Sequence, residues 1–433
     1  GKHIVVQGGT MRNDAIVRAL ELLTKSEVVR CDSPELMGAY GCALYAMKHQ
    51  GDALSLNEML SKSTFVTQLQ NCKGCDNNCL VQSFRFADNR RYFSGNRCEK
   101  IFTNNAVAKK AGQNIYKLKN ELLFSRCSKI FQPKFIIGIP RVLNMFEEYP
   151  FWHTLFSECD IEVRLSAPSN FSSYEKTVRM VMSDNICFPA KLVHSHIDNL
   201  FRQGVDRIFM PFVLFESKSN KEQNSYNCPI VTAYSVVVKS VQQCSVPIDS
   251  PSISFKNRNL LLKQCINYLS SFKIDKKRIL VAFEKAEAAQ KRFCKELAEA
   301  NMRVLETALG RNEMCVLLAG RPYHTDPLIQ HRMAEMIAKM GIHVLTDDIV
   351  RAEDIDISET HFLSQWSYPN RIMKAAKWCT KQKVKIPFVQ MTSFGCGPDA
   401  FICDEVRDFL LRNKTLNLYL QISHLQQKVD LMG

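Results

Sequence analysis

The chain has 433 residues, of which 46% are hydrophobic and 23% are charged, and this composition excludes a disordered protein and predicts about three domains. Basic residues outnumber acidic ones, for a net charge of +14, but the excess is spread along the chain without interleaved aromatic residues, so we expect no nucleic-acid partner. No apolar run reaches the ~20 residues of a membrane-spanning helix and no signal-peptide pattern opens the sequence, so we expect a cytoplasmic protein without a membrane partner.

The first 55 residues predict a strand, a helix, a second strand and a second helix. These elements are expected at His3–Gln7, Ala15–Leu23, Glu27–Arg30 and Leu36–His49. Gly8 and Gly9 form a tight turn after the first strand, and Asn13 or Asp14 is placed to cap the first helix. Two strands are too few for a stable sheet, so we interpret residues 1–55 as the end of a larger domain.

Residues 56–130 contain four cysteines with the spacing C-x2-C-x3-C-x18-C: Cys72, Cys75, Cys79 and Cys98. Four thiolates so spaced can hold a tetrahedral zinc ion or an iron–sulfur cluster. The predicted hairpin of Gln82–Phe86 and Arg91–Phe93 resembles a zinc ribbon, whereas the tight first triplet suits a cluster, so both metals stay open. Without a secretion signal, we expect the 17 cysteines to be reduced, and some of them to be buried small hydrophobes.

From residue 131 onward strands alternate with helices, which predicts two doubly wound α/β lobes, residues 131–270 and 271–433. The expected strands are Phe135–Ile139, Ile161–Leu165, Arg207–Phe212, Ile230–Ala233, Met314–Leu318, His343–Leu345 and Pro387–Met391. The expected helices are Met145–Glu158, Lys191–Arg202, most of 256–305, Ile329–Met340 and Asn370–Lys381. Ligands bind such sheets in the crevice at the carboxyl ends of the strands.

Three further cysteines stand at the ends of these elements: Cys187 precedes a predicted helix, Cys228 precedes a predicted strand, and Cys396 follows one. Their spacing alone favours buried structural thiols, and the alternative is a four-iron cluster with one iron left open. Between a predicted strand and helix, Arg321 is suited to bind a phosphate or carboxylate and His324 to donate a proton. A structural arginine and a turn histidine are the simpler interpretation of that pair.

Several motifs resemble the large fused proteins of the 2-hydroxyacyl-CoA dehydratase activator family. Two of them, Gln7–Asp14 and Leu36–Leu44, resemble the end of an activator ATPase of the acetate kinase and actin type. The segment Cys72–Cys98 is similar to the linker of the family. The motifs that resemble its dehydratase-subunit-like region are Ile139–Asn144, Glu148–Trp152, Cys187–Lys191, Gly320–His324 and Ser393–Asp399.

The resemblance implies that Cys187, Cys228 and Cys396 hold a 4Fe-4S cluster. In the family, the activator hydrolyses ATP to drive one electron from its own cluster to a cluster in a dehydratase-like component. The implied partners are a second copy of the chain or a dehydratase-type subunit, and a low-potential electron donor such as ferredoxin or flavodoxin, in anaerobic metabolism.

The resemblance also implies that Gly8, Gly9 and Asn13 face the nucleotide in the intact protein. The phosphate-binding loops and the magnesium-binding carboxylate of the family lie before the first residue of this chain. We therefore expect no ATPase activity from this chain alone, and ATP with Mg²⁺ only in the intact protein. The sequence after residue 415 departs from the family's pattern.

We therefore predict an iron–sulfur redox component that accepts or relays low-potential electrons in an ATP-driven activase system. The alternative is a non-catalytic scaffold that docks the activator onto a partner. In this alternative a zinc ion stabilises the four-cysteine segment. The three dispersed cysteines distinguish the two, because a scaffold needs no cluster with an open iron.

Overall fold

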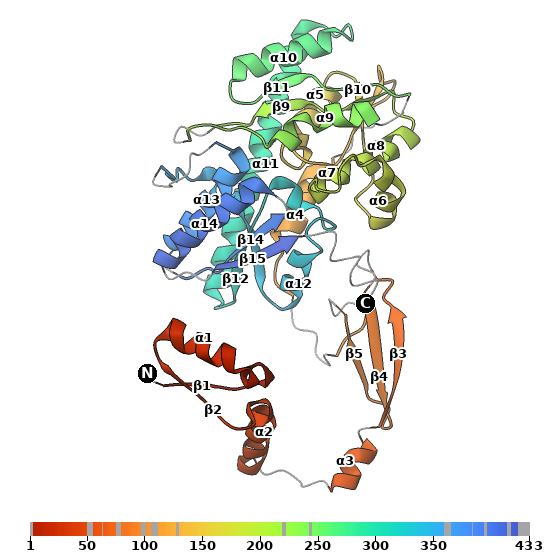
Figure 1. The fold of residues 1–433 in the computed structure, drawn as a ribbon. Coiled ribbons are helices and arrows are strands. Elements are labelled where there is room, and N and C mark those ends of the chain that lie inside the picture. Colours follow the sequence, from red (N-terminus) through yellow and green to blue (C-terminus); the bar gives the residue numbers. More distant parts are fainter. Residues whose placement is uncertain are drawn as a thin grey trace. The chain divides into compact units, whose positions relative to one another are not determined.

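Figure 1 shows the fold in a computed structural model. The structure describes residues 3–49, 55–62, 64–74, 79–96, 101–104, 111–126, 130–218, 222–241, 245–358, 365–382, 384–393, 396–413 and 417–422. The chain forms two compact units, of which the first comprises Gly1–Gln68 with Phe84–Tyr92 and the second Leu69–Ser83 with Phe93–Gly433. Each unit is described by itself below.

The first unit opens with a strand–helix–strand–helix segment, as predicted. Its elements are β1 (His3–Val6), α1 (Asp14–Thr24), β2 (Glu27–Arg30) and α2 (Met37–Lys48), and a short helix, α3 (Leu56–Lys62), follows. The strands β1 and β2 pair in parallel, with α1 as the connection between them. The side chain of Asn13 caps α1, since its Oδ1 accepts a hydrogen bond of 3.0 Å from the Ala15 N–H.

A three-stranded sheet follows, in the order β3 (Phe65–Asn71), β4 (Leu80–Phe86) and β5 (Arg91–Ser94). The predicted hairpin is present as β4 and β5, and Asn89 adopts the left-handed conformation (φ 65°) that its tight turn requires. Where β3 ends and β4 begins, the Cys72 N–H donates a 2.8 Å hydrogen bond to the Cys79 carbonyl. The other two cysteines predicted to bind metal here, Cys75 and Cys98, lie outside the described residues.

The second unit contains two four-stranded sheets whose pairings are all parallel. The first has the order β10-β8-β6-β7 and the second the order β13-β12-β14-β15. Their strands are β6 (Ile136–Ile139), β7 (Glu162–Leu165), β8 (Arg207–Phe209), β10 (Ile248–Asp249), β12 (Cys315–Ala319), β13 (His343–Thr346), β14 (Phe388–Ser393) and β15 (Asn417–Ile422). The predicted α/β class is therefore confirmed.

Proline interrupts the first sheet at two neighbouring positions. The sequence predicts one strand over Arg207–Phe212, but the structure divides it at Pro211 into β8 and β9 (Phe212–Phe215). Pro251 likewise separates β10 from β11 (Ser252–Ser254), which pairs in parallel with β9. Because proline has no N–H to donate to a ladder, the pairing stops and restarts at both positions.

The strand predicted at Ile230–Ala233 is wrong, because these residues belong to helix α9 (Pro229–Val241). The run of β-branched residues favoured a strand, but the buried residues Val231, Tyr234 and Val238 recur at helical spacing. Pro229 also suits the first position of a helix, where its fixed φ is already helical and no N–H is needed. Cys228 therefore precedes a helix and not a strand.

Helices surround both sheets of the second unit (Figure 1). They are α4 (Ile115–Phe124), α5 (Met145–Ser157), α6 (Phe171–Thr177), α7 (Phe188–Lys191), α8 (Val193–Arg202), α10 (Arg258–Ser270), α11 (Lys276–Gly310), α12 (Met333–Lys339), α13 (Ser367–Thr380) and α14 (Gly397–Arg412). Among the described residues, no helix is both long and apolar enough to cross a membrane.

The long helix α11 joins the two halves of the second unit. It packs against α5 and α10 beside the first sheet and against α4 and β13 beside the second. One continuous hydrophobic core contains Ile137 from the first sheet, Phe283 from α11 and Leu317 from the second sheet. The second unit therefore has one large core that includes residues of both sheets, and a smaller hydrophobic cluster with Val316, Leu318 and Met391 lies at the second sheet.

Helix α5 contains Pro150, and a side chain from α11 completes its backbone hydrogen bonding there. The Gln290 amide group donates to the Glu147 carbonyl at 2.9 Å and accepts from the Phe151 N–H at 3.3 Å. These are the two backbone groups that would bond each other in a regular helix. Gln290 thus bridges the opened turn and fixes α11 against α5.

Candidate functional site

The three dispersed cysteines each stand directly before a helix of the second unit. Cys187 precedes α7, Cys228 precedes α9 and Cys396 precedes α14. Each of these helices has a proline at its first or second position, namely Pro189, Pro229 or Pro398. A helix N-terminus has a positive partial charge, and it therefore favours the thiolate form of a nearby cysteine.

Arg321 lies within electrostatic reach of all three thiols. Its guanidinium donates a hydrogen bond to the Cys396 Sγ at 3.1 Å. Burial raises the pKa of Cys187, and the charge of Arg321 acts against this increase. Cys228 in turn contributes to the raised pKa of Arg321. Cys228 also acts on both other cysteines, since its own charge raises the pKa of Cys187 and of Cys396. The side chains that the sequence singled out thus lie in one region of the second unit.

Burial keeps the thiols of Cys187 and Cys396 protonated at neutral pH in the absence of a metal. Burial raises the pKa of Cys396 to about 12, although Arg321 acts in the opposite direction. Burial also raises the pKa of Cys187, against the backbone N–H of Ala190 and the charge of Arg321. A metal that takes a thiol as a ligand must displace its proton, so binding at such thiols releases protons.

Asp399 holds Arg321 in place. The Arg321 guanidinium bonds the Asp399 carboxylate at 2.7 Å, and both side chains are buried. The Asp399 carboxylate also accepts a 3.0 Å hydrogen bond from the Ser393 N–H at the end of β14. Burial disfavours the charged form of both groups. The charge of each group stabilises the charge of its partner more strongly, so the pKa of Asp399 is lowered and the pKa of Arg321 is raised.

His324 is fully buried beside Arg321. Its Nδ1 accepts a 3.1 Å hydrogen bond from the Arg321 N–H, so the proton of the neutral ring is on Nε2. Burial lowers the pKa of His324 to about 3, which leaves the ring uncharged at neutral pH. Among the described residues, Nε2 has no hydrogen-bond partner. The ring therefore presents one buried N–H that can donate to a bound group.

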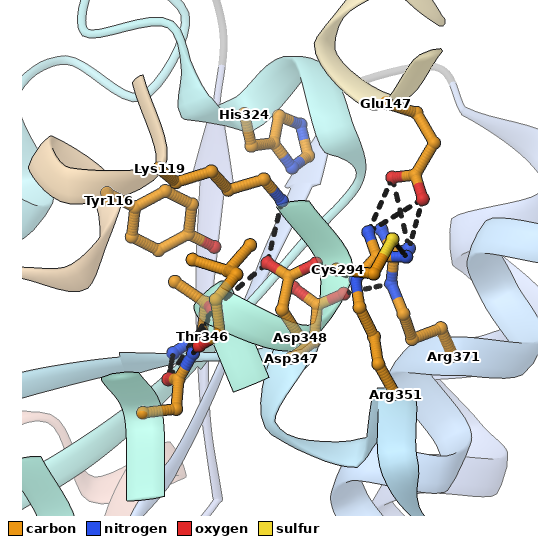
Figure 2. Close-up of polar contacts among 12 residues, drawn as sticks. Tyr116, Lys119, Glu147, Cys294, His324, Thr346, Asp347, Asp348, Arg351 and Arg371 are labelled. Atoms are coloured by element: carbon orange, nitrogen blue, oxygen red, sulfur yellow. Dashed lines mark hydrogen bonds and ion pairs between the residues drawn. The ribbon is translucent and has the colours of Figure 1, made fainter. Parts of the chain in front are cut away.

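A second set of buried polar residues lies beside His324, and Figure 2 shows both together. Three cations and three anions alternate there: Lys119, Arg351, Arg371, Glu147, Asp347 and Asp348. Lys119 pairs with Asp348 at 2.7 Å, and Arg351 pairs with Asp348 and with Glu147 at 2.6 Å. Arg371 completes the charge network through Asp347 at 2.6 Å and Glu147 at 3.1 Å.

The charge network gathers residues from four segments. Lys119 comes from α4, Glu147 from α5 and Arg371 from α13, and the other three come from the 3-10 helix Asp347–Ala352 (η5). Burial acts against the charge of Asp348, yet Lys119 and Arg351 outweigh it and hold its pKa far below the ordinary value. The charge network is balanced, so it adds no net charge to the interior.

Glu148 and Glu216 form a buried carboxyl pair next to the charge network. Burial raises the pKa of Glu148 well above its ordinary value, and the neighbouring Glu216 raises it further. Neutral donors surround the pair, with Trp152 on Glu148 at 3.2 Å and Tyr368 and Asn227 on Glu216 at 2.8 and 2.7 Å. Two carboxylates this close do not both ionise readily, so the pair retains a proton.

Residues 136–350, about half of the chain, match a family model described as "CoA enzyme activase uncharacterised domain". The chain belongs to the CoA enzyme activase family. The predicted membership of a 2-hydroxyacyl-CoA dehydratase activator-type family is thereby confirmed. The matched range runs from β6 into η5 and includes Cys187, Cys228, Arg321 and His324, whereas Cys396 and Asp399 lie beyond it.

Similarities to solved structures are weak. The crystal structure of ZnuA is 7% identical, with 68% of this chain and 94% of that chain covered and a TM-score of 0.19. A putative sugar binding protein from Salmonella typhimurium LT2 is 10% identical, with 73% and 88% covered and a TM-score of 0.22. The C-terminal domain of glucosamine-fructose-6-phosphate aminotransferase from Francisella tularensis is 8% identical, with 74% and 89% covered and a TM-score of 0.20. No curated protein sequence matches the chain.

The sequence pattern of this CoA enzyme activase chain did not reveal all the residues of the candidate site. Asp399 ends one of the motifs that carry the resemblance, but its pairing with Arg321 has no signal in the spacing. Asp347 and Asp348 directly follow strand β13, and a carboxylate at the carboxyl end of a parallel strand is the signal that could have found them. Lys119 has no such signal, because a lysine in an amphipathic helix usually points to solvent.

The predicted metal and nucleotide residues stay predictions. Among the described residues, no three His, Cys, Asp or Glu side chains are arranged to hold a single metal ion. A four-iron cluster needs thiolates that are spaced more widely than the ligands of one ion, and the three thiols near Arg321 have the chemistry for it. In the first unit, Gly8 has a φ of 102° that favours glycine, and Asn13 is engaged as the helix cap.

Proposed function

We propose that this chain is the iron–sulfur redox component of an ATP-driven 2-hydroxyacyl-CoA dehydratase activase-type system. It accepts or relays low-potential electrons through a 4Fe-4S cluster held by Cys187, Cys228 and Cys396. One observation carries the proposal: three cysteines that are far apart in the sequence stand at three helix N-termini, and one buried arginine, Arg321, donates a hydrogen bond to Cys396 and interacts electrostatically with Cys187 and Cys228.

The donor set fits a low-potential cluster. Three thiolates leave one iron of a four-iron cluster open, and such a cluster supplies one-electron transfer and a place for an external ligand. The partial positive charges of three helix N-termini, together with Arg321, offset the negative charge of the thiolates. Hydrogen bonds to the sulfurs tune the reduction potential of a cluster, and Arg321 makes such a bond to Cys396.

Two further residues have roles in this proposal. Asp399 fixes the guanidinium of Arg321 and neutralises it when no thiolate is present. His324 offers its buried Nε2–H, which has no partner among the described residues, to an anionic group bound nearby. Asp399 acts by positioning Arg321, because its carboxylate is already paired with that guanidinium. His324 acts as a neutral hydrogen-bond donor, because its ring is uncharged at neutral pH.

The four-cysteine segment is proposed as a second metal site, holding zinc or a 4Fe-4S cluster at Cys72, Cys75, Cys79 and Cys98. The Cys72 N–H donates a hydrogen bond to the Cys79 carbonyl, so the backbones of these two cysteines lie side by side. The intact protein is proposed to bind ATP at Gly8, Gly9 and Asn13. A dehydratase-type subunit or a second copy of the chain, and a donor such as ferredoxin or flavodoxin, are the proposed partners.

The test is anaerobic reconstitution of the chain with iron and sulfide, followed by iron analysis and electron paramagnetic resonance of the reduced protein. We expect Cys228→Ala to lose about four irons per chain and the corresponding resonance signal. The matched control is Cys265→Ala, which removes a buried thiol of α10 that has no interaction with Arg321. Equal iron content in both variants and the unchanged chain would contradict the proposal.

A further inference from the structure

The second unit has a pocket of about 640 Å³ that the proposed electron-transfer function does not use. None of its lining residues is Cys187, Cys228, Cys396, Arg321 or His324. A volume of this size lies within the roughly 300–1,000 Å³ that small-molecule sites enclose. One face of α11 lines it with Glu287, Gln290, Lys291, Cys294, Lys295 and Ala298, and helices α5 and α10 contribute Phe151 and Leu261.

The walls of the pocket are apolar. Phe151 and Phe255 meet edge to face with ring centroids 5.5 Å apart, and Leu261 and Ala298 extend this apolar surface. Phe151, Leu261 and Ala298 are buried, so part of the pocket wall consists of side chains that are otherwise shielded from water. Such walls bind an apolar group because they remove it from water.

The floor of the pocket is polar, but its charged groups are already paired. Arg351 bonds Asp348 through Nε and Glu147 through one terminal nitrogen, and its other terminal nitrogen lies 3.6 Å from the Cys294 Sγ. Gln290 uses its amide in the backbone of α5. The floor therefore has no unpaired charge with which to attract an ion.

One charged side chain of the rim has no ion-pair partner among the residues that the structure describes. Arg258 pairs with Glu284 and with Glu287, and Glu299 lies 3.8 Å from Lys295 and 3.7 Å from Arg303. Lys291 is exposed and has no ion-pair partner in the part of the chain that the structure describes. The lining therefore combines apolar walls with one exposed lysine that has no ion-pair partner among the described residues.

We propose that this pocket binds a small amphipathic monoanion. The apolar body of the ligand lies against Phe151, Phe255 and Leu261, and its anionic group meets Lys291 at the rim. The inference rests on the pocket alone, so it holds or fails independently of the iron–sulfur function.

The test compares three probes that share an eight-carbon chain and differ in charge: octanoate, octanol and octylammonium. Calorimetric titration of the full chain should show octanoate binding about threefold more tightly than octanol, and octylammonium more weakly than either. In the Lys291→Met variant, octanoate should bind no more tightly than octanol. The control is Lys277→Met, which removes an exposed lysine of the same helix that does not line the pocket.

A second measurement locates the probe. Cys294 lines the pocket, so bound octanoate should slow its alkylation by iodoacetamide by about tenfold at a concentration ten times the dissociation constant. Peptide mass spectrometry separates Cys294 from the other cysteines, and circular dichroism shows that each variant is folded. The proposal is overturned if octanoate and octanol bind equally, if Lys277→Met weakens octanoate as much as Lys291→Met does, or if octanoate leaves the alkylation of Cys294 unchanged.

Discussion

At the scale of single residues, Arg321 is the group on which the candidate site depends. It is buried, and among the described residues it forms an ion pair only with Asp399, while the thiol of Cys396 accepts a hydrogen bond from the same guanidinium. A buried charge whose partner is removed is strongly destabilising. The Arg321–Asp399 pair therefore controls both the stability of this region and the acidity of the nearby thiol.

We expect Asp399→Asn to lower the free energy of unfolding by about 3–5 kcal/mol, because it leaves Arg321 without a counter-charge. The pKa of Cys396 should fall below its value of about 12, since Asp399 raises it and the charge of Arg321 is no longer neutralised. Chemical unfolding and the pH dependence of Cys396 alkylation measure the two effects. Asp408→Asn, an exposed change on the same helix, should alter neither quantity.

The Glu148–Glu216 pair predicts a dependence of stability on pH. Folding raises the pKa of Glu148, so the carboxyl contributes its full stability below its unfolded pKa of about 4.3. This contribution is lost as the pH rises toward the higher folded value. Glu148→Gln keeps a neutral side chain there, so the decline in the free energy of unfolding between pH 5 and 8 should be smaller than in the unchanged chain.

Denaturant titrations at these two pH values measure that decline. Glu121→Gln, an exposed change on α4, serves as the control and should leave the decline as it is. An equal decline in Glu148→Gln and the unchanged chain would show that this pair does not retain a proton.

At the scale of elements, helix α5 depends on a side chain from another helix. Pro150 interrupts it, and the Gln290 amide bonds the two backbone groups that no longer bond each other. The same stretch carries Glu147 and Glu148 into the buried polar region and Phe151 into the pocket wall. The position of α11 against α5 therefore sets the geometry of both.

We expect Gln290→Leu to destabilise the chain by about 2–4 kcal/mol, because it leaves the Glu147 carbonyl and the Phe151 N–H without a partner. The Phe151 amide should also exchange with deuterium faster, whereas amides in α13 should not. Lys291→Met is the control, since it changes the next residue and leaves the backbone bridge intact. A Phe151 amide that is equally protected in both variants would contradict this role of Gln290.

At the scale of the whole molecule, a large hydrophobic core with residues from both sheets and the buried charge network join the second unit. The charge network links α4, α5, η5 and α13, and α11 packs beside both sheets. We therefore expect the second unit to unfold as one cooperative block, although its two sheets are formed by separate stretches of the sequence.

The change Lys119→Met tests this coupling. It removes one partner of the buried pair with Asp348 and should cost about 3–5 kcal/mol. Because the block is cooperative, tryptophan fluorescence from Trp152, beside the first sheet, and from Trp378, on α13, should report the same lowered midpoint. Single-tryptophan variants separate the two signals, and different midpoints for them would show that the sheets unfold independently.

The sequence predicted the α/β class and most of the strands, because short apolar runs next to Gly or Pro identify buried parallel strands. It failed at Pro211 and at Ile230–Ala233, where a missing N–H and a helical burial pattern outweighed β-branched composition. Cys187, Arg321 and His324 stand in motifs that the sequence identified, and their functional roles stay predictions. The charge network was not, because no local pattern distinguishes a buried Lys119 from a solvated one.

The charge network also has a consequence for the rate of folding. Lys119 and Asp348 are 229 positions apart in the sequence, and Glu147 and Arg371 are 224 apart. Ions this deeply buried leave water only when their partners are present, so these pairs form after very long loops have closed. Such non-local steps make folding slow. We expect the second unit to refold slowly. We also expect a high barrier to unfolding to keep it in the native state as much as its equilibrium stability does.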